Sequence, residues 1–222
     1  AGTTGAGKST VAAQYADTAA ARGDRSAIYC FDERRETFLA RADGLGMDLR
    51  RHVAEGRVEL NEMAVGEMAP GMFVDQVRRA VEERDVRIVI IDSVTGFLLA
   101  TDGAREVIVQ LHELLSFLGA AGVLTLMIVT DHGLMPGRSE IDASYLSDTV
   151  MLLRHFEAAG AMHRCIAVTK KRHGAHENTI RQLRTGPQGI EVGPPLTRFR
   201  GVLSGTPEYH GDEAKLIDDD KI

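Results

Sequence analysis

The first residues of this chain combine glycines, a lysine and hydroxyl side chains at a spacing typical of phosphate chemistry. Residues 2–9 fit the pattern G-x-x-x-x-G-K-[ST], and a helix-forming run follows them. Glycine permits backbone angles that bring successive N–H groups onto one anion, and the dipole of the following helix adds to the attraction. The complete pattern disfavours a plain glycine-rich turn. It predicts a loop for a nucleoside triphosphate, made by Thr4, Gly5, Ala6, Gly7, Lys8, Ser9 and Thr10.

Three polar residues are expected to handle the charge of the phosphates. Lys8 should reach the β- and γ-phosphates, which gives it a catalytic as well as a binding role, and the Ser9 hydroxyl should bind Mg²⁺. Asp92 follows four aliphatic residues, an arrangement that holds Mg²⁺ or its water opposite a phosphate loop. The alternative for Asp92 is a carboxylate that ends a buried strand at a turn.

An acidic pair, Asp32 and Glu33, is the candidate for activating water. Hydrolysis of a nucleoside triphosphate needs a group that orients and deprotonates the attacking water. Adjacent side chains at a strand end point in opposite directions, so we expect one carboxylate to face that water and the other to lie beside the metal. The alternative is a turn with two solvated acids.

A dense cationic segment occupies residues 170–176. Lys170 and Arg172 are two apart on an extended chain, so both would point to one side and could supply positive charge to a γ-phosphate, often in a neighbouring subunit. The alternative is a solvated basic turn. His173 and His176 lie in the same segment, but other ligands at zinc spacing are missing nearby, so we do not predict a zinc site.

The surrounding elements predict an α/β fold with a mostly parallel central sheet. Apolar runs typical of buried strands alternate with helical segments, and three of them end in polar residues that should meet at one sheet edge. The expected strands are 26–31, 58–60, 87–91 and 123–129, and the expected helices after the first are 35–45, 73–83 and 104–120, with a polar connection after residue 46.

The last third of the chain has a different pattern. Two β-prone runs separated by a short polar and glycine-containing connection predict an antiparallel hairpin, followed by shorter strands. The hairpin strands are 149–156 and 163–170, and the shorter strands are 179–183, 189–192 and 199–203. We therefore expect an antiparallel C-terminal extension beyond the parallel core.

Length and composition favour a single domain, which we place over residues 1–207, and an acidic tail or linker over 208–222. Phosphate loops normally leave a strand, and only Ala1 precedes this one, so we expect a fragment that lacks its anchoring strand. A net charge of -6 and the absence of tryptophan make nucleic acid an unlikely partner, and a membrane span is not expected. Two cysteines without metal-ligand spacing indicate a cytoplasmic location.

Taken together, the motifs resemble the KaiC family of RecA-like P-loop ATPases, over residue 1 to about residue 207. They are GTTGAGKST (2–10), FDER (31–34), LGMD (45–48), IIDS (90–93), SDT (147–149) and K-x-R-x-G-x-H (170–176). The resemblance implies ATP as the nucleotide and a homo-oligomer, usually a hexameric ring, with ATP bound between subunits. It also implies roles for Asp32 and Glu33 as general base and metal partner. Because the family usually has Glu-Glu, Glu33 is the safer choice for the base.

The same resemblance assigns the cationic segment to the nucleotide of a neighbouring subunit. The residues that it brings to the nucleotide are Arg164, Lys170, Lys171, Arg172 and His176. It further implies a signalling or timing switch with signalling proteins as partners.

Autophosphorylation is a second activity that the resemblance raises. KaiC phosphorylates itself on an adjacent Ser-Thr pair, and this chain has Ser144 and Tyr145 at the matching positions. Ser144 is therefore the candidate phosphosite, without an ordered two-site cycle. The alternative is a serine that bonds the local backbone.

Two other functions are compatible with the same core. A DNA-dependent ATPase of the RecA/RadA kind would use residues 133–143 to bind DNA, but that segment has one arginine, Arg138, beside Glu140 and Asp142. A non-hydrolysing nucleotide sensor that recruits partners is the third interpretation.

Overall fold

The computed structural model describes residues 1–63, 69–99, 104–130 and 146–211. The chain divides into two compact units. The unit that we call the parallel-sheet unit comprises Lys8–Thr130 and Gly186–Gly189. The antiparallel-sheet unit comprises Ala1–Gly7, Asp131–Thr185 and Ile190–Ile222. The chain passes from one unit to the other between Gly7 and Lys8, within the predicted phosphate loop.

The parallel-sheet unit confirms the predicted α/β core. Its sheet has the order β2-β1-β3-β4, and each neighbouring pair runs parallel. The strands are β1 (Arg25–Cys30), β2 (Val58–Glu62), β3 (Val86–Asp92) and β4 (Leu124–Met127). Because parallel strands share one direction, the residues that follow β1, β3 and β4 come to the same edge, as the sequence predicted.

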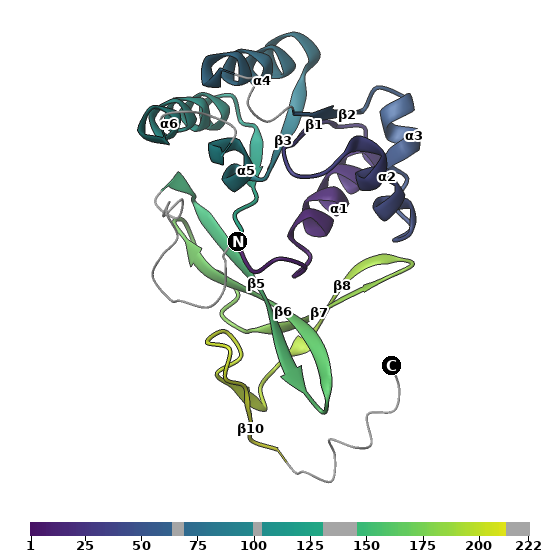
Figure 1. The fold of residues 1–222 in the computed structure, drawn as a ribbon, viewed down its shortest axis with the longest axis vertical. Helices are drawn as coiled ribbons and strands as arrows, with labels where there is room; N and C mark the ends of the chain where they lie inside the picture. Colours follow the sequence, from purple (N-terminus) through teal and green to yellow (C-terminus); the bar gives the residue numbers. More distant parts are fainter. Residues whose placement is uncertain (64–68, 100–103, 131–145, 212–222) are drawn as a thin grey trace. The chain divides into compact units, whose positions relative to one another are not determined.

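Helices cover both faces of this sheet (Figure 1). One face carries α1 (Lys8–Ala21), α2 (Arg35–Asp43) and α3 (Leu49–Ala54). The other carries α4 (Pro70–Arg84), α5 (Val94–Leu99) and α6 (Ala104–Ala120). A strand between two helical layers must be apolar on both sides, which explains the uninterrupted aliphatic run of β3.

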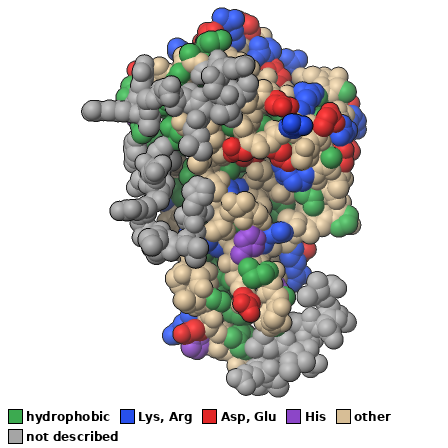
Figure 2. Space-filling model, in the orientation of Figure 1, with side chains coloured by type: hydrophobic (Ala, Val, Ile, Leu, Met, Phe, Trp, Pro, Cys, Tyr) green, Lys and Arg blue, Asp and Glu red, His purple; other side chains and the backbone are tan. Residues whose placement is uncertain are grey.

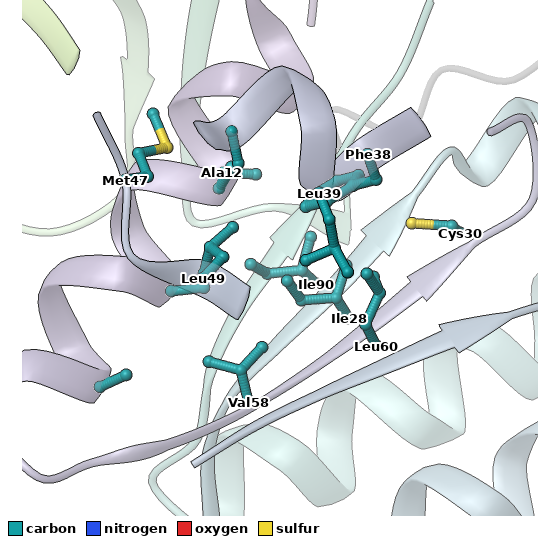
Figure 3. Close-up of a cluster of buried hydrophobic side chains, with 14 of the residues drawn as sticks. Ala12, Ile28, Cys30, Phe38, Leu39, Met47, Leu49, Val58, Leu60 and Ile90 are labelled. Carbon is teal, nitrogen blue, oxygen red and sulfur yellow. The ribbon is translucent and has the colours of Figure 1, made fainter. Parts of the chain in front are cut away.

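Each face of the parallel sheet has its own apolar core. Ile28 of β1, Leu60 of β2 and Ile90 of β3 pack under the helices of the first face, beside Phe38 and Leu49 (Figure 3). On the opposite face, four aromatic rings form a cluster that we call the aromatic cluster. Their centroids lie 4.7–5.7 Å apart in four contacting pairs. The rings are those of Tyr29, Phe31, Phe73 and Phe97.

The antiparallel-sheet unit contains the predicted hairpin. β5 (Thr149–Ala158) and β6 (Ala161–Lys171) pair antiparallel, and the sheet continues in the order β5-β6-β7-β8. β7 (Arg181–Gly186) and β8 (Gly189–Pro195) complete it. A small core of Phe156, Cys165 and Val202 packs in this unit.

The structure differs from the sequence prediction in short elements. The expected polar connection after residue 46 contains α3, and α5 follows Asp92 directly, although neither helix was predicted. β9 (Phe199–Arg200) is shorter than expected and pairs with β10 (Glu208–Tyr209), which begins where we placed the acidic tail. Six-residue helices and two-residue strands have too few periodic positions for a pattern to reveal. Among the described residues, no helix is long and apolar enough to cross a membrane.

Candidate functional site

The glycine part of the phosphate loop is tied to β5 within the antiparallel-sheet unit. Gly2 forms a parallel bridge with Leu153, and the Leu153 N–H donates to the Ala1 carbonyl at 2.9 Å. The backbone nitrogen of Ala1 donates to the Met151 carbonyl at 2.8 Å. Gly2 has a φ of 150°, and a Cβ there would overlap the Leu153 carbonyl oxygen. Only glycine permits this approach, so the first glycine of the pattern has a structural reason here.

His155 of β5 lies beside the loop, a contact that sequence reasoning missed. Its Nδ1 is 3.4 Å from the Thr3 hydroxyl, and a Cβ on Gly5 would be in ordinary contact with its ring. Gly5 and Gly7 have positive φ values of 78° and 98°, as a phosphate-binding turn requires. No motif marks His155, because its closeness to the loop depends on strand pairing.

In the parallel-sheet unit, Lys8 opens α1 and the next residue meets the predicted metal carboxylate. The Ser9 hydroxyl forms a hydrogen bond with Asp92, which ends β3 and is 8% exposed. Burial raises the pKa of Asp92, while the Ser9 hydrogen bond opposes that rise. A buried carboxylate of this kind is stabilised by a cation, so the Ser9–Asp92 pair fits the predicted Mg²⁺ role.

A closed metal cage is not seen among the described residues, where no group of three or more His, Cys, Asp or Glu side chains could hold an ion. Mg²⁺ does not need such a cage in nucleotide sites. It commonly keeps waters and binds one or two protein groups together with substrate phosphates. Ser9 and Asp92 could therefore hold it with the nucleotide supplying the other oxygens.

Asp32 is fixed by a contact from the end of the neighbouring strand. The Ser93 hydroxyl donates to Asp32 Oδ2 at 2.5 Å and accepts from the Gly96 N–H at 2.9 Å. The peptide bond between Asp92 and Ser93 is cis. A Cβ on Gly96 would overlap Asp32 Oδ1 and Phe31 Cβ, so α5 can lie this close only because residue 96 is glycine. These roles of Ser93 and Gly96 were not predicted from the sequence.

Glu33 is held by a bidentate ion pair with Arg41, in the last turn of α2. Arg41 Nη2 donates to Oε2 at 2.7 Å, and Nε donates to Oε1 at 3.3 Å. The same guanidinium donates through Nη1 to the Thr10 hydroxyl at 3.3 Å and lies 4.8 Å from the Phe38 ring centroid. Arg41 was also missed, since nothing in its local sequence points to Glu33.

The predicted site residues fall into two groups, one in each unit of the chain. Ser9, Thr10, Asp32, Glu33 and Asp92 lie at one sheet edge of the parallel-sheet unit, as predicted. The cationic residues belong to the antiparallel-sheet unit: Arg164, Lys170, Lys171, Arg172 and His176.

Several cations of this second group already have partners. Arg164 lies opposite His155 in the β5–β6 pairing and donates to the Thr185 hydroxyl at 2.9 Å. Arg172 pairs with Asp148 at 3.0 Å, and Lys171 donates to the Ala175 carbonyl at 3.2 Å. The β5–β6 pairing shifts by one residue here, because Val150 lies opposite Lys170 whereas Met151 lies opposite Val168. Contact of these cations with a neighbouring subunit's nucleotide remains a prediction.

Two predictions concern residues that the structure does not describe. Ser144, the candidate phosphosite, and residues 133–143, the candidate DNA-binding segment, both lie outside the described ranges. On the face drawn in Figure 2, basic and acidic side chains of the described residues are interspersed. Among the described residues, ion pairs between such side chains include Arg50–Asp43 and Arg57–Glu55.

Comparisons with known proteins agree with the geometry. A family model described as "ATPase: KaiC" matches residues 1–197. The circadian clock protein KaiC3 of Synechocystis sp. is 29% identical over 212 residues, which are 94% of this chain and 41% of that protein. The circadian clock oscillator proteins KaiC of Acaryochloris marina and Synechococcus elongatus are 25% and 24% identical, over 93% of this chain and 40% of each relative. The chain therefore spans about two fifths of the length of these curated relatives.

Proposed function

This chain belongs to the KaiC family of ATPases, and we propose that it binds ATP with Mg²⁺ and hydrolyses it. The glycine loop and Lys8 bind the phosphates. Ser9 and Asp92 would hold Mg²⁺, which would supply positive charge to the phosphates. Glu33 accepts a proton from the attacking water, and Asp32 is the further carboxylate that could contact the ion.

The observation that carries this proposal is the Ser9–Asp92 hydrogen bond at the edge that also bears Asp32 and Glu33. Phosphoryl transfer requires mainly positioning and charge stabilisation, so the residue types must meet at one place. Four polar residues from three distant segments of the sequence do so in the parallel-sheet unit. A solvated acidic turn would not require the Ser93 hydroxyl and Gly96 to hold Asp32 in place.

The fuller assembly is part of the proposal. We propose a homo-oligomer, a hexameric ring in which Arg164, Lys170, Lys171, Arg172 and His176 of one subunit contact the ATP of the next. The position of Lys170 near the end of β6, followed by exposed Lys171 and Arg172, supports such a role. Buried free cysteines at positions 30 and 165 support a cytoplasmic location. The KaiC and KaiC3 names of the relatives motivate a role in timing or signalling, with signalling proteins as partners.

The test is phosphate release from ATP by the full-length protein, with and without Mg²⁺. Lys8→Ala should lower kcat/KM at least about a hundredfold because it removes charge stabilisation from the transferring phosphoryl group. Lys215→Ala is a control that removes a lysine from the acidic tail and should leave the rate unchanged. Bound ATP without released phosphate on prolonged incubation would instead indicate a non-hydrolysing sensor.

Two further measurements test the assembly and the kinase activity. If cations of a neighbouring subunit contribute, hydrolysis per subunit should fall on dilution to monomer, and a constant rate would contradict this part of the proposal. Mass spectrometry after incubation with ATP should find phosphate on Ser144. Unmodified Ser144 under conditions of sustained hydrolysis would rule out the autokinase activity while leaving the ATPase intact.

A further inference from the structure

Arg41 makes more contacts with the candidate site than any motif indicates. It bridges Glu33, the proposed base, and Thr10, a predicted phosphate-binding residue, while its guanidinium packs over Phe38. The side chains of Arg41 and Glu33 are 29% and 25% exposed, so the pair is partly shielded from water. A bidentate arginine–carboxylate pair is stronger and more directional than a single contact.

This geometry restricts what Glu33 can do. Both of its oxygens accept hydrogen bonds from Arg41, and the guanidinium is itself fixed by Thr10 and Phe38. A general base must instead direct a lone pair at the proton that it takes from water. Each Glu33 oxygen keeps a second lone pair, but the bidentate pair fixes the direction in which it points, so Glu33 has to leave or distort the pair to meet a water that lies in another direction.

Thr10 links the same contact to the nucleotide. Thr10 is a buried residue, 9% exposed, and its hydroxyl accepts a hydrogen bond from Arg41. If the Thr10 hydroxyl donates to a phosphate, that anion comes close to Arg41 and competes with Glu33 for the guanidinium. Occupation of the loop then weakens the hold on Glu33 at the moment when a base is needed.

We propose that Arg41 is a positioning residue that holds Glu33 in a resting pair, and that this pair must open before Glu33 takes part in hydrolysis. The inference rests on the proposed ATPase function. In the step that it controls, a water O–H bond breaks and its proton passes to Glu33. The water oxygen bonds to the γ-phosphorus, and the bond from that phosphorus to the bridging oxygen breaks, so that ADP and phosphate leave.

Steady-state hydrolysis by the full-length protein tests the resting pair. Arg41→Gln should raise kcat about two- to fivefold, the range expected for loss of a partly exposed ion pair, and leave KM for ATP within about twofold. Arg41→Lys keeps the aliphatic stem over Phe38 but loses the fork, so a smaller increase is expected. Arg41→Lys also provides the test if Arg41→Gln does not fold. An unchanged or lower kcat in the folded variants would overturn the inference.

A matched control comes from the same region. Arg50 pairs with Asp43 at 2.6 Å and Glu36 at 2.9 Å, two exposed carboxylates of α2, and touches none of the candidate catalytic residues. Arg50→Gln should therefore leave kcat unchanged. A rise equal to that of Arg41→Gln would mean that the effect comes from loosening α2 and would overturn the role of the Glu33 pair.

A double variant separates action through Glu33 from action on the fold. In a Glu33→Gln background, Arg41→Gln should produce no increase in single-turnover hydrolysis, because the base that it restrains is gone. An increase in that background would overturn the inference. Absence of turnover in the unmodified protein would overturn the proposed function itself, whereas turnover without the Arg41 effect overturns only the resting pair.

Discussion

The central strands of the parallel sheet, β1 and β3, are buried to a greater extent than the hairpin strands β5 and β6. In β1 every residue after Arg25 is buried, and in β3 only Arg87 is exposed. In β5 and β6 most positions are half-buried or exposed, and the buried ones are Leu153, Phe156, Cys165 and Ala167. Helices on both faces explain the first pattern.

The difference separates two kinds of functional residue. The acidic residues follow strands whose backbones are fixed by packing on both sides, which favours accurate geometry. Lys171 and Arg172 lie at and just beyond the exposed end of a hairpin strand, where their side chains have more freedom. A metal site needs residues held as rigidly as the acidic ones. A contact that forms when subunits assemble tolerates side chains as free as those of the cations.

The largest expected effect concerns one strand from each of the two sheets. Ile90→Ala in β3 removes a fully buried side chain and should lower the free energy of unfolding by about 2–5 kcal/mol. Ile166→Ala in β6 affects a half-buried side chain and should cost about 1 kcal/mol. Denaturant titration of both variants checks the contrast, and equal costs would contradict it.

The next effect concerns the close approach of α5 to the acidic turn. Gly96→Ala should displace Asp32, lower the free energy of unfolding by about 1–3 kcal/mol and lower hydrolysis about tenfold or more. Gly119→Ala in α6 is the control. A Cβ there meets no atom within 4 Å, so this change should stabilise the helix by about 0.5–1 kcal/mol. Full activity in Gly96→Ala would show that the position of Asp32 does not matter.

Replacing Asp92 should have a smaller effect on the free energy of unfolding, and should raise it rather than lower it. Burial raises its pKa above the ordinary value of 3.8, so the folded nucleotide-free protein binds this proton more tightly than the unfolded chain. The stability contribution of Asp92 is therefore present below 3.8 and is lost as pH rises through the raised pKa. Asp92→Asn should stabilise the nucleotide-free protein near neutral pH by on the order of 1 kcal/mol and remove Mg²⁺-dependent nucleotide binding.

Thermal unfolding of Asp92→Asn from about pH 3.8 to neutral pH measures the change in stability. The same measurement with and without Mg-ATP reports the loss of nucleotide binding. Asn leaves the Ser9 hydroxyl a partner of similar size, so the comparison isolates the charge. A variant that is less stable without nucleotide at every pH would contradict the assignment of Asp92 as a carboxylate kept for its ligand.

The smallest effect is expected at the cationic end of the hairpin. Arg172 and Asp148 are 49% and 71% exposed, so Asp148→Asn should change the free energy of unfolding by less than about 0.5 kcal/mol. It should not reduce hydrolysis, because Arg172 remains available to a neighbouring subunit. A loss above 1 kcal/mol by denaturant titration (about twice the expected limit) would show that the hairpin end is as tightly built as the parallel core.

Sequence patterns predicted the long elements because burial on one or two faces leaves a periodic trace. The aliphatic run of β3 and the paired runs of β5 and β6 are examples. α3 carries Arg50 and Arg51, whose charges pair with carboxylates on the surface, so its six residues read as a polar connection. α5 was missed because six residues are too few to show a helical period, although Ser93 before it is an N-cap residue whose hydroxyl accepts from the Gly96 N–H.

The site could be predicted as far as its residues form local motifs. The phosphate loop, Asp32-Glu33 and Asp92 each have a recognisable neighbourhood, and the structure brings Ser9 and Asp92 together. The contacts of Ser93 with Asp32 and of Arg41 with Glu33 join segments 61 and 8 residues apart. Such contacts depend on strand order and on side-chain direction, which a single sequence does not specify.

The aromatic cluster contains Phe31, the residue that precedes the acidic pair Asp32-Glu33. Phe31 immediately precedes Asp32, and its ring lies 5.3 Å from Phe97 of α5 and 5.7 Å from Phe73 of α4. The chain contains no tryptophan. Phe97→Trp would thus install a single indole fluorophore directly behind the carboxylates, and its emission wavelength would report water entry beneath them on arrival of a ligand.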